Sequence, residues 1–462
     1  MSARTHCTVR PVAPRVRAVL VNFNGGVMIE RAVTHVLATQ WPAGSLEVVV
    51  VDNASADGSA DRLARRFPQV QLRRSTRNLG FAGGTNLGLL DLRDVDHVAL
   101  VNSDAFVSPG WLQPLVEAVE SEPAVGAACP KILFASRFVE LELRTEPHVP
   151  GGNDPRQLGV RLSGVRAGSQ DGWQWVNFVR GFYWPEIDHA VSCEPPFRWS
   201  GPRALLWAPV PDEAAPCSGL ELRLASDREK HVEIISGGDV THALVGREPR
   251  WVEVAASGPL FDVVNNAGSC LTDRGYGADR GFRERDDGRF DTPRDVFAWC
   301  GAAVLLSGAY LEDVGRFCDR YFLYYEDFDL SWRGLGRGWR YRYVPSSVVR
   351  HVHAASTREG SATFEHFVHR NRLLTLVKNA PAGFAARQMA AFVGELRQLT
   401  TQEVVLPLAR RQRPHPRRTS RQLRAGLGFA KQLPHALRER RRIAARSTVG
   451  PAEVLARSSR DG

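Results

Sequence analysis

The stretch VALVNSDAFVSPGWL, from Val98 to Leu112, decides the fold class of this chain. Its first four residues are apolar and predict a buried strand, which the polar residues Asn102, Ser103 and Asp104 bring to an end. Ligands of open α/β sheets bind at the carboxyl ends of such strands. Mg²⁺ is usually held by one or two carboxylates together with substrate phosphates. The stretch therefore predicts either a cation site at Asp104 or an ordinary turn whose polar side chains bond their own backbone.

Strands and helices are predicted to alternate on the N-terminal side of this stretch. Val16 to Phe23 and Leu46 to Val51 are apolar runs that predict buried strands, and a helical pattern follows each of them. Apolar strands that alternate with amphipathic helices are typical of a parallel sheet covered on both faces. We therefore predict an α/β fold with a Rossmann-like, mixed and mostly parallel sheet.

Polar residues and glycines follow these strands and form a candidate ligand site. Asp52 ends the second strand and has no helix to cap, so its carboxylate is placed to accept hydrogen bonds from a ribose or a base N–H. The loop from Arg77 to Gly88 contains four glycines, which let a backbone approach a ligand closely. A plain flexible turn would have the same composition.

A second chemical centre is predicted in YFLYYEDFDLSWR, from Tyr321 to Arg333. Phe328, Trp332 and Leu335 have helical spacing, so a helix should begin near Glu326 with three acids in its first turn. The helix macrodipole stabilises acids at this end, but one or two would satisfy it. Three acids behind five aromatic or apolar residues favour a functional site.

Four segments, in this order and spacing, resemble a known family: VLVNFNGG, VVVVDNASADGS, RNLGFAGGTNLGL and VNSDAFVSPGWL. Together they resemble the nucleotide-binding half of inverting family 2 glycosyltransferases, especially the rhamnosyltransferase-like branch. The resemblance implies the GT-A fold, a nucleotide-sugar donor such as dTDP-rhamnose, and a divalent cation, Mg²⁺ or Mn²⁺. The metal motif of the family is usually Asp-x-Asp, whereas this chain has Asn102 first and Asp104 as the single carboxylate.

The resemblance also implies roles for individual residues. Asp327 matches the carboxylate that removes the proton of the acceptor hydroxyl, a contribution of roughly 10²–10⁴-fold in rate. Glu326 would orient the acceptor, or would serve as the base in place of Asp327. His351 matches a histidine that completes the metal site with Asp104, and His353 is the alternative. An ordinary histidine at a strand edge would show the same pattern.

The remaining site residues are also implied by the resemblance. The acceptor would bind at Trp299, Cys300, Gly301 and Ala302, the last three of which are expected to lie in a strand. The donor would bind at Asn22, Asn24, Asp52, Asn53, Ser55, Asn78, Gly80, Gly83, Asn86, Asn102 and Ser103.

The alternation of strands and helices stops after Leu133. Period-two alternation such as Leu220 to Leu224, and a hairpin turn at Gly237-Gly238, predict antiparallel structure. We therefore predict an inserted, β-rich and sandwich-like domain at residues 136–260, between GT-A halves at 15–135 and 261–381. Its six tryptophans would form a buried core or a sugar-binding surface, and we favour the core.

The basic charge of the chain lies at its C-terminus. The 462 residues carry a net charge of +10, and fifteen basic against three acidic residues follow from Arg410 onward. We expect residues 382–462 to form a helical basic tail with apolar positions at Leu423, Leu427 and Phe429. Such a tail can hold a protein on an anionic membrane. Nucleic acid is the competing partner, which we do not expect.

No apolar run approaches the ~20 residues that span a bilayer, and the N-terminus lacks the apolar centre of a signal peptide. We therefore expect a cytoplasmic protein, peripheral on the inner face of the cell membrane. Seven cysteines without a C-x-x-C pair fit neither a disulfide framework nor a zinc site.

These features together predict an inverting glycosyltransferase that transfers a sugar from a nucleotide-diphosphate sugar to a hydroxyl of a cell-envelope glycan or a lipid-linked acceptor. A sugar nucleotidyltransferase is one alternative, but it needs a basic residue in the first turn, which Asn22 to Gly26 lacks. A non-catalytic glycan-binding protein is the other, and the set Asp104, Asp327 and His351 argues against it.

Overall fold

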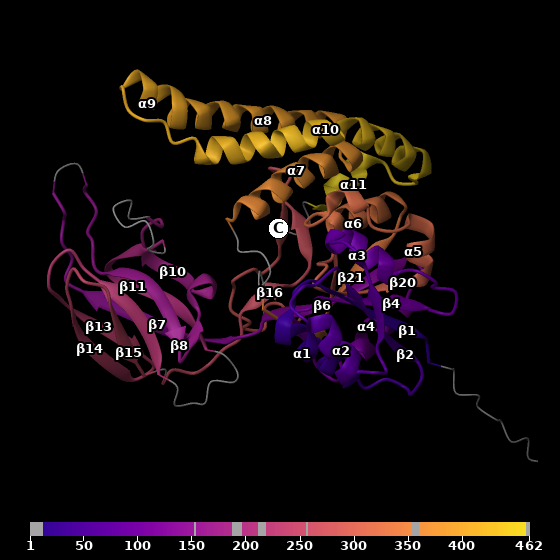
Figure 1. Cartoon of the computed structure of the whole chain (residues 1–462), viewed down its shortest axis with the longest axis horizontal. Helices are drawn as coiled ribbons and strands as arrows, with labels where there is room; N and C mark the ends of the chain where they lie inside the picture. The colour runs from indigo at the N-terminus through magenta and orange to yellow at the C-terminus, as the bar shows by residue number, and fades with distance from the viewer. Residues whose placement is uncertain are drawn as a thin grey trace, which may run out of the picture. The chain divides into compact units, whose positions relative to one another are not determined.

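The computed structural model describes residues 13–151, 154–186, 196–210, 219–255, 257–352 and 360–458 (Figure 1). The described residues form two compact units. The first, called the α/β unit below, comprises Met1–Leu133, Asn265–Phe282 and Gly288–Gly462. The second, called the β unit, comprises Phe134–Val264 and Arg283–Asp287.

The α/β unit is built on a mixed sheet, which has ten strands within the described residues. Their order is β19-β21-β6-β20-β4-β1-β2-β3, with β16 beside β6 and β5 beside β21. Strands β4, β1, β2 and β3 are parallel, whereas β20 runs antiparallel to β4 and β6. The strands are β1 (Val16–Asn22), β2 (Leu46–Asp52), β3 (Gln71–Arg74), β4 (His97–Val101), β5 (Ala105–Val107), β6 (Val125–Phe134), β16 (Val264–Asn266), β19 (Arg294–Val296), β20 (Ala303–Ser307) and β21 (Arg340–His351). The sheet confirms the predicted fold class.

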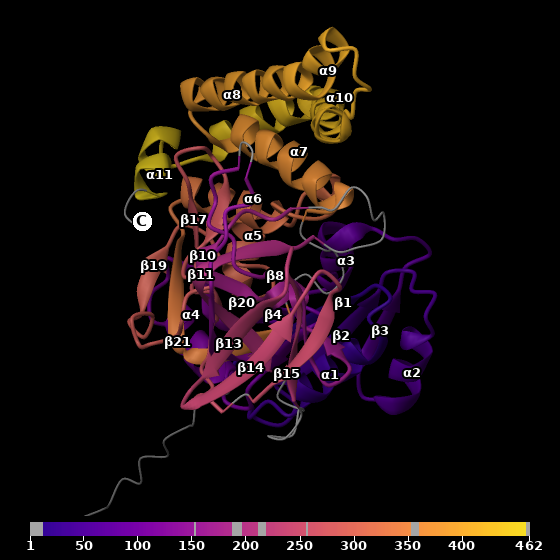
Figure 2. The same ribbon diagram turned by 90° about the vertical axis from the view of Figure 1, so that its left-hand side faces the viewer.

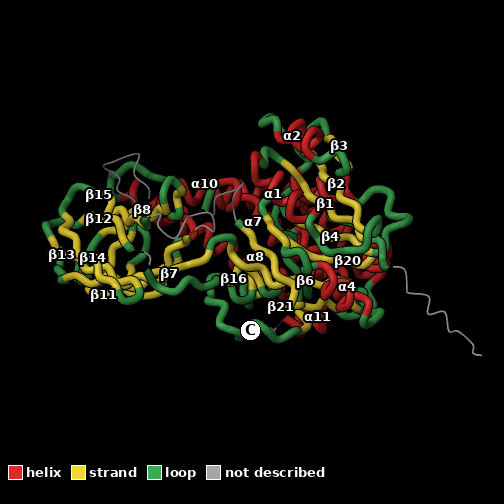
Figure 3. Tube along the Cα trace, turned by 90° about the horizontal axis from the view of Figure 1, so that it is seen from below, coloured by secondary structure: helices red, strands yellow, loops and turns green. Residues whose placement is uncertain are grey.

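Helices pack against this sheet and bury its central strands. Leu20, Val50 and Ala99, from β1, β2 and β4, are completely buried, as expected for strands covered on both faces. Figure 3 shows the strands in yellow with the helices beside them in red. The helices are α1 (Gly26–Leu37), α2 (Ser59–Arg66), α3 (Gly80–Gly88), α4 (Leu112–Glu120), α5 (Gly308–Val314), α6 (Glu326–Gly336), α7 (Ala362–Asn379), α8 (Ala382–Thr400), α9 (Leu406–Ala409), α10 (Arg417–Arg446) and α11 (Pro451–Ser458).

The glycine-rich segment that we expected to be a loop forms helix α3. Two of its glycines let the helix lie directly on strand β1, because a Cβ atom at Gly84 would be 2.8 Å from Val21 and one at Gly88 would be 2.3 Å from Val19. The glycines therefore serve close helix–strand packing rather than loop flexibility.

The β unit contains, within its described residues, a nine-stranded antiparallel sheet in the order β14-β13-β7-β11-β8-β12-β15, with β10 beside β11 and β9 beside β8. Strand β11 pairs with β8 through its first residues and with β7 through its later ones, so the sheet wraps around one core. The strands are β7 (Arg137–Thr145), β8 (Arg161–Ala167), β9 (Gln170–Asp171), β10 (Asn177–Phe182), β11 (Arg198–Val210), β12 (Leu220–Ala225), β13 (Lys230–Ser236), β14 (Asp239–Val245) and β15 (Arg250–Val254). This is the antiparallel structure that the sequence predicted.

The expectation of a tryptophan-rich core in this unit is wrong. The core consists of aliphatic side chains such as Leu141, Leu206 and Ile234. None of the six tryptophans is fully buried, and Trp184 and Trp251 are 86% and 38% exposed. In β15 the alternation of side chains places Val252 and Val254 in the core and Trp251 on the outer face.

The long segment of the β unit, Phe134–Val264, begins and ends at one place. Phe138 and Phe261 exchange two backbone hydrogen bonds, of 2.8 and 3.0 Å, and the Phe134 N–H donates to the Val263 carbonyl at 2.9 Å. The two ends of the insertion therefore lie side by side, and we call this pairing the neck.

The C-terminal helices belong to the α/β unit. Helix α10 packs along α7 and also contacts α8 (Figure 1). Among the residues that the structure describes, every helix is too short or too polar to cross a membrane.

Candidate active site

The two residues predicted to bind a metal lie together at the end of strand β4. Strand β5 pairs with the end of β21, which places His351 opposite Ala105. Asp104 Oδ1 lies 3.2 Å from His351 Nε2, and both residues are largely buried, with 8% and 6% exposed. Strand β21 runs without a break from Arg340 through Pro345 to His351, and this length carries His351 to Asp104.

Asn265 orients His351, and we did not predict this residue. Its Oδ1 lies 3.1 Å from His351 Nδ1, and it is 2% exposed. When Nδ1–H donates to this oxygen, the neutral ring turns the lone pair of Nε2 toward the Asp104 carboxylate. The sequence feature that could have identified it is the pair Asn265-Asn266 directly after an apolar run.

The geometry of this pair fits a divalent cation. Neighbouring ligands of an octahedral Mg²⁺ lie about 3 Å apart, since each bond is about 2.1 Å long, and the Asp104–His351 separation is 3.2 Å. Within the described residues there is no group of three or more His, Cys, Asp or Glu side chains that could hold a metal. The two side chains would therefore share the ion with oxygens of a ligand or of water. His353, the alternative ligand, lies outside the described residues.

Asp327 lies in the first turn of α6, as predicted. Its Oδ2 accepts a hydrogen bond from the Gly301 N–H at 2.9 Å, and its Oδ1 accepts one from the Phe328 N–H at 2.7 Å. Burial raises its pKa to about 6, although these two hydrogen bonds act in the opposite direction. The carboxylate is thus ionised at neutral pH and basic enough to accept a proton.

Glu326 has a different environment. It is 5% exposed, and burial, followed by the neighbouring Asp327, raises its pKa well above the ordinary value. Its Oε2 is buried without a hydrogen-bond partner among the described residues. Glu326 therefore favours the neutral form, which makes Asp327 the better candidate for the base.

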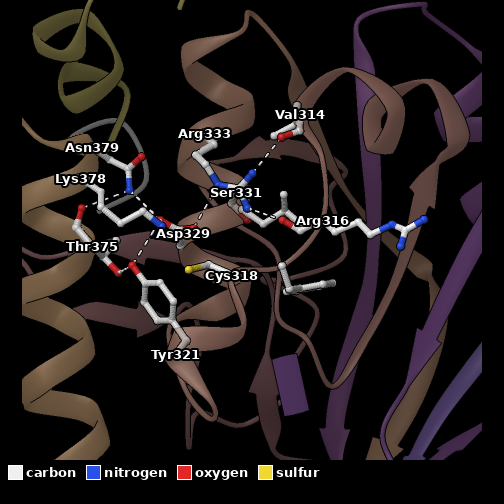
Figure 4. Close-up of polar contacts among 12 residues, drawn as sticks. Val314, Arg316, Cys318, Tyr321, Asp329, Ser331, Arg333, Thr375, Lys378 and Asn379 are labelled. Carbon is white, nitrogen blue, oxygen red and sulfur yellow. Dashed lines mark hydrogen bonds and ion pairs between the residues drawn. The ribbon is translucent and has the colours of Figure 1, made fainter. Parts of the chain in front are cut away.

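The third acid of this turn, Asp329, has a structural role (Figure 4). Its Oδ1 lies 2.7 Å from Lys378 Nζ and accepts hydrogen bonds from Asn379 at 3.0 Å and from Tyr321 at 3.2 Å. Its Oδ2 accepts a hydrogen bond from Arg333 at 3.1 Å. Burial alone would raise its pKa, but the two cations and these hydrogen bonds hold the pKa at about 2. Asp329 therefore binds α6 to α7, and only two of the three acids remain for chemistry.

The turn before α6 has an unusual backbone. Phe322, Tyr324 and Tyr325 have φ angles of 66°, 66° and 69°. Residues other than glycine rarely adopt this region of backbone conformation. The completely buried Asn371 of α7 holds this turn, because its Nδ2 lies within hydrogen-bond distance of the carbonyls of Tyr321, Leu323 and Tyr324, at 3.0, 2.8 and 2.7 Å.

Gly80 is required by this turn. A Cβ atom there would lie 2.2 Å from the carbonyl oxygen of Phe322, and its φ is +71°. The N-terminus of α3 therefore lies directly against the turn that precedes α6.

Several asparagines that we assigned to the donor are engaged within the protein. Asn22 donates hydrogen bonds to Asp52 at 3.0 Å, Ser55 at 3.1 Å and Ser59 at 2.8 Å. It also accepts one from the Gly25 N–H at 3.1 Å. Asn22 thus joins the ends of β1 and β2 rather than facing a ligand.

Asn53 and Asn86 show the same behaviour. Asn53 donates to Asn78 and to the Gly80 carbonyl, and accepts from the Leu79 N–H, at 2.8 to 3.0 Å. Asn86 accepts from the Phe317 N–H at 3.1 Å and donates to its carbonyl at 2.8 Å. In sequence, a ligand-binding asparagine and one that holds a loop look alike.

The other donor-site candidates are at the surface or are constrained by packing. Asn24 is exposed and accepts a hydrogen bond from the Ala56 N–H at 2.8 Å. Asn102 and Ser103 are partly exposed beside Asp104. A Cβ atom at Gly83 would be 2.8 Å from Leu79, so packing requires this glycine.

The acceptor-site candidates precede strand β20, so Cys300, Gly301 and Ala302 do not lie in a strand, contrary to our expectation. Trp299 is completely buried, Cys300 is partly exposed, and Gly301 lies against Asp327. Burial also raises the pKa of the Cys300 thiol, which keeps it neutral.

Backbone pairing connects the two chemical centres. The Asn102 N–H donates to the Ala302 carbonyl at 2.9 Å, beside the β4–β20 pair Val101 and Ala303. Since Ala302 follows Gly301, whose N–H donates to Asp327, the Asp104–His351 pair and Asp327 lie at the same edge of the sheet.

Asp279, on strand β18 (Gly277–Asp279), is a further acid near the base that we did not predict. It raises the pKa of Asp327 and of Cys300, in both cases after burial. Its Oδ1 accepts hydrogen bonds from Asn266 at 2.6 Å and Ser269 at 3.2 Å. It lies in the Gly- and Asp-rich stretch before Asp291, which carries no periodic pattern.

The sequence comparison agrees with this arrangement. The family model described as glycosyl transferase family 2 matches residues 18–170. Residues 18–170 are therefore similar to glycosyl transferase family 2. The matched residues include most of β1, all of β2 to β4 and Asp104, whereas Asp327 and His351 lie beyond them.

Two curated proteins are similar to this chain. Both are N-acetylglucosaminyl-diphospho-decaprenol L-rhamnosyltransferases of Mycobacterium tuberculosis, from strains CDC 1551 / Oshkosh and ATCC 25618 / H37Rv. Each is 30% identical over 152 residues, which cover 30% of this chain and 48% of the relative. The chain thus spans about half the length of the curated relatives it matches.

One solved structure with partial similarity is that of GalNAc-T7 with UDP, GalNAc and Mn²⁺. It has a TM-score of 0.43 and 12% sequence identity, and the match covers 84% of this chain and 51% of the GalNAc-T7 chain. Another is S. aureus TarS 1-349, at a TM-score of 0.24 and 17% identity, covering 26% of this chain and 35% of that one.

Proposed function

We propose that this protein is an inverting glycosyltransferase that transfers a sugar from a nucleotide-diphosphate sugar to a hydroxyl of a lipid-linked or cell-envelope glycan acceptor. The observation that carries the proposal is Asp327, a carboxylate with a pKa of about 6 at the sheet edge that also holds the Asp104–His351 pair. A base and a diphosphate site at one edge are what a single displacement at the anomeric carbon requires.

In the proposed reaction, Asp327 removes the proton of the acceptor hydroxyl while the hydroxyl oxygen forms a bond to the anomeric carbon. The bond from that carbon to the diphosphate breaks on the opposite face, so the configuration inverts. The N–H groups of Gly301 and Phe328 hold the carboxylate in place. Such a base contributes roughly 10²–10⁴-fold. Neutral Glu326 would donate a hydrogen bond to the acceptor.

Asp104 and His351 would hold a divalent cation, Mg²⁺ or Mn²⁺. When bound, the ion would supply positive charge to the departing diphosphate. Asn265 fixes the ring of His351 so that Nε2 faces this position. Among the donor-site candidates, Asp52, Ser55, Asn102 and Ser103 would contact the nucleotide-sugar, while Asn22, Asn53 and Asn86 would support them.

The names of the relatives suggest the substrate class. They are L-rhamnosyltransferases that act on an N-acetylglucosaminyl-diphospho-decaprenol. We propose dTDP-rhamnose as the donor and a polyprenyl-diphosphate-linked glycan as the acceptor, used in cell-wall polysaccharide synthesis. Such an acceptor is presented at a membrane, so we propose a cytoplasmic protein whose basic C-terminal helices bind the anionic inner face.

Transfer assays with the full-length chain test this proposal. The chain is incubated with a panel of nucleotide-sugars and a short-chain N-acetylglucosaminyl-diphospho-lipid, with Mg²⁺, with Mn²⁺ or with a chelator. We expect product from dTDP-rhamnose with inverted anomeric configuration by NMR, and little product from D327N. Neither transfer nor donor hydrolysis with any nucleotide-sugar, together with binding of free glycans, would instead support the glycan-binding alternative.

A further inference from the structure

The end of the α8–α10 helix pair carries exposed aliphatic side chains. After α8 the chain continues through a π-helical turn, Thr401–Val405, and α9 before it reverses into α10. Val405, Leu406 and Leu408 are 52%, 42% and 56% exposed. Figures 1 and 2 both show α9 at the end of this pair. We call residues 401–418 the apex.

The apex is also strongly basic. Between Glu403 and Glu439 the sequence has nine basic residues and no acidic residue. All five apex arginines are exposed: Arg410, Arg411, Arg413, Arg417 and Arg418. The one apex acid, Glu403, accepts hydrogen bonds from the Thr419 N–H at 2.9 Å and its hydroxyl at 3.0 Å. Its charge therefore faces the start of α10, and the outer surface of the apex is cationic.

Backbone hydrogen bonds fix the shape of the apex. The Arg410 N–H donates to the Leu406 carbonyl at 3.0 Å, the Gln412 N–H to Pro407 at 2.8 Å, and the His415 N–H to Glu403 at 3.1 Å. The aliphatic side chains are thus displayed by a closed turn and do not belong to a frayed helix end.

The remainder of α10 is less suited to a membrane than its sequence indicated. Phe429, one of the apolar positions that we expected to face lipid, packs with Leu433 against Tyr321 and Leu374. One side of α10 is thus used inside the protein, while Leu423, Leu427 and Leu437 stay exposed on the helix.

We propose that the apex inserts into an anionic lipid surface. The aliphatic side chains would enter the acyl-chain boundary, and the arginines would bind the headgroup phosphates. Nucleic acid would match the arginines but leave the valine and leucine side chains in water. The benefit of such an anchor rests on the proposed lipid-linked acceptor, whereas the anchor itself is tested without substrates.

The test is co-sedimentation of the full-length chain with vesicles of equimolar phosphatidylglycerol and phosphatidylcholine, or of phosphatidylcholine alone. The apex variant is L406Q/L408Q. The matched control is V393Q/L437Q on α8 and α10, since both of these side chains are 46% exposed. A third variant, R410Q/R411Q/R413Q, removes apex charge. Thermal melts verify that each variant is folded.

We expect the unaltered chain and the control to bind the anionic vesicles, and the apex variant to bind at least tenfold more weakly. The arginine variant should lose most of the salt-sensitive binding. Equal binding by the apex variant and the control would overturn the proposal, as would preferential binding to a duplex DNA competitor. Transfer to a water-soluble acceptor should be unaffected in the apex variant, so failure of the anchor and failure of the proposed reaction give different results.

Discussion

Asp327 and Asp329 are two residues apart on the same helix turn and have opposite environments. Asp327 accepts hydrogen bonds from two backbone N–H groups and is close enough to Asp279 for that acid to raise its pKa, which is about 6. Asp329 meets Lys378 and Arg333, and its pKa is about 2. Burial raises the pKa of both, so the difference comes from the partners. Adjacent acids in a motif therefore have separate roles, which are assigned by what each carboxylate touches.

The largest expected effect is on stability and concerns Asp329. Asp329→Ala leaves Lys378 and Arg333 as buried cations without their acid, which should lower the free energy of unfolding by about 3–5 kcal/mol. Urea unfolding at pH 7 measures this change in the free energy of unfolding. Asp327→Ala, the matched control from the same turn, should change the free energy far less. Equal losses would remove the distinction between the two acids.

Asp329 and Asp327 should also make the stability of the protein depend on pH in opposite directions. The pKa of Asp329 is depressed, so its contribution to stability is present above its unfolded value of 3.8 and is lost as the pH falls through about 2. The pKa of Asp327 is raised, so its contribution is present below 3.8 and is lost as the pH rises through about 6.

The second effect is on catalysis. Asp327→Asn keeps the shape of the side chain but cannot accept the proton, so kcat should fall by about 10²-fold or more while the KM for the donor changes little. In the unaltered enzyme kcat/KM should rise with pH through about 6. Steady-state kinetics with Glu326→Gln as the control decide the assignment: near-normal kcat in D327N with a large loss in E326Q would exchange the two roles.

The third effect is on metal-dependent binding. Asp104→Ala should weaken Mg²⁺-dependent binding of a nucleoside diphosphate by about tenfold or more, because it removes the carboxylate of the pair. Asn265→Ala should weaken metal binding roughly 10–100-fold through the orientation of His351. Calorimetry with and without a chelator measures both. Unchanged affinity in D104A with Mg²⁺ present would show that the pair holds no cation.

The smallest effect is a shift of the pH profile. Asp279 raises the pKa of Asp327, so Asp279→Asn should move the rise of kcat/KM to lower pH by less than about one unit. Asp273→Asn, at an exposed position in the same stretch, is the control and should leave the profile in place. A shift to higher pH in D279N would contradict the electrostatic explanation.

The fold was predictable because its determinants are local. The apolar strands before Asn22, Asp52 and Asn102 and the start of α6 at Glu326 follow from periodicity. Side-chain contacts between distant residues were not predictable. No pattern indicates that Asn371 meets the turn after Tyr321, because 50 residues separate them and the contact exists only in the folded chain.

The same limit applies within the candidate site. Asn22 and Asn53 carry the residue type expected for ligand binding, yet their hydrogen-bonding groups are engaged inside the protein. Asp279 was missed because its stretch carries no periodic pattern, whereas Asn265 follows an apolar run and was missed because no pattern indicates that it contacts His351. Residue type indicates which chemistry is available, whereas the tertiary fold decides whether a ligand or the protein uses it.

The neck of the β unit has a consequence for how this chain arose and for how it can be engineered. Because Phe138 and Phe261 pair directly, about 120 intervening residues leave and return through one antiparallel pair of strands. A gene segment encoding them could be gained or lost by a single event without changing the order of the strands in the sheet beside Asp104. The inserted segment could therefore be replaced by a short hairpin or by a different domain, since its two ends lie side by side.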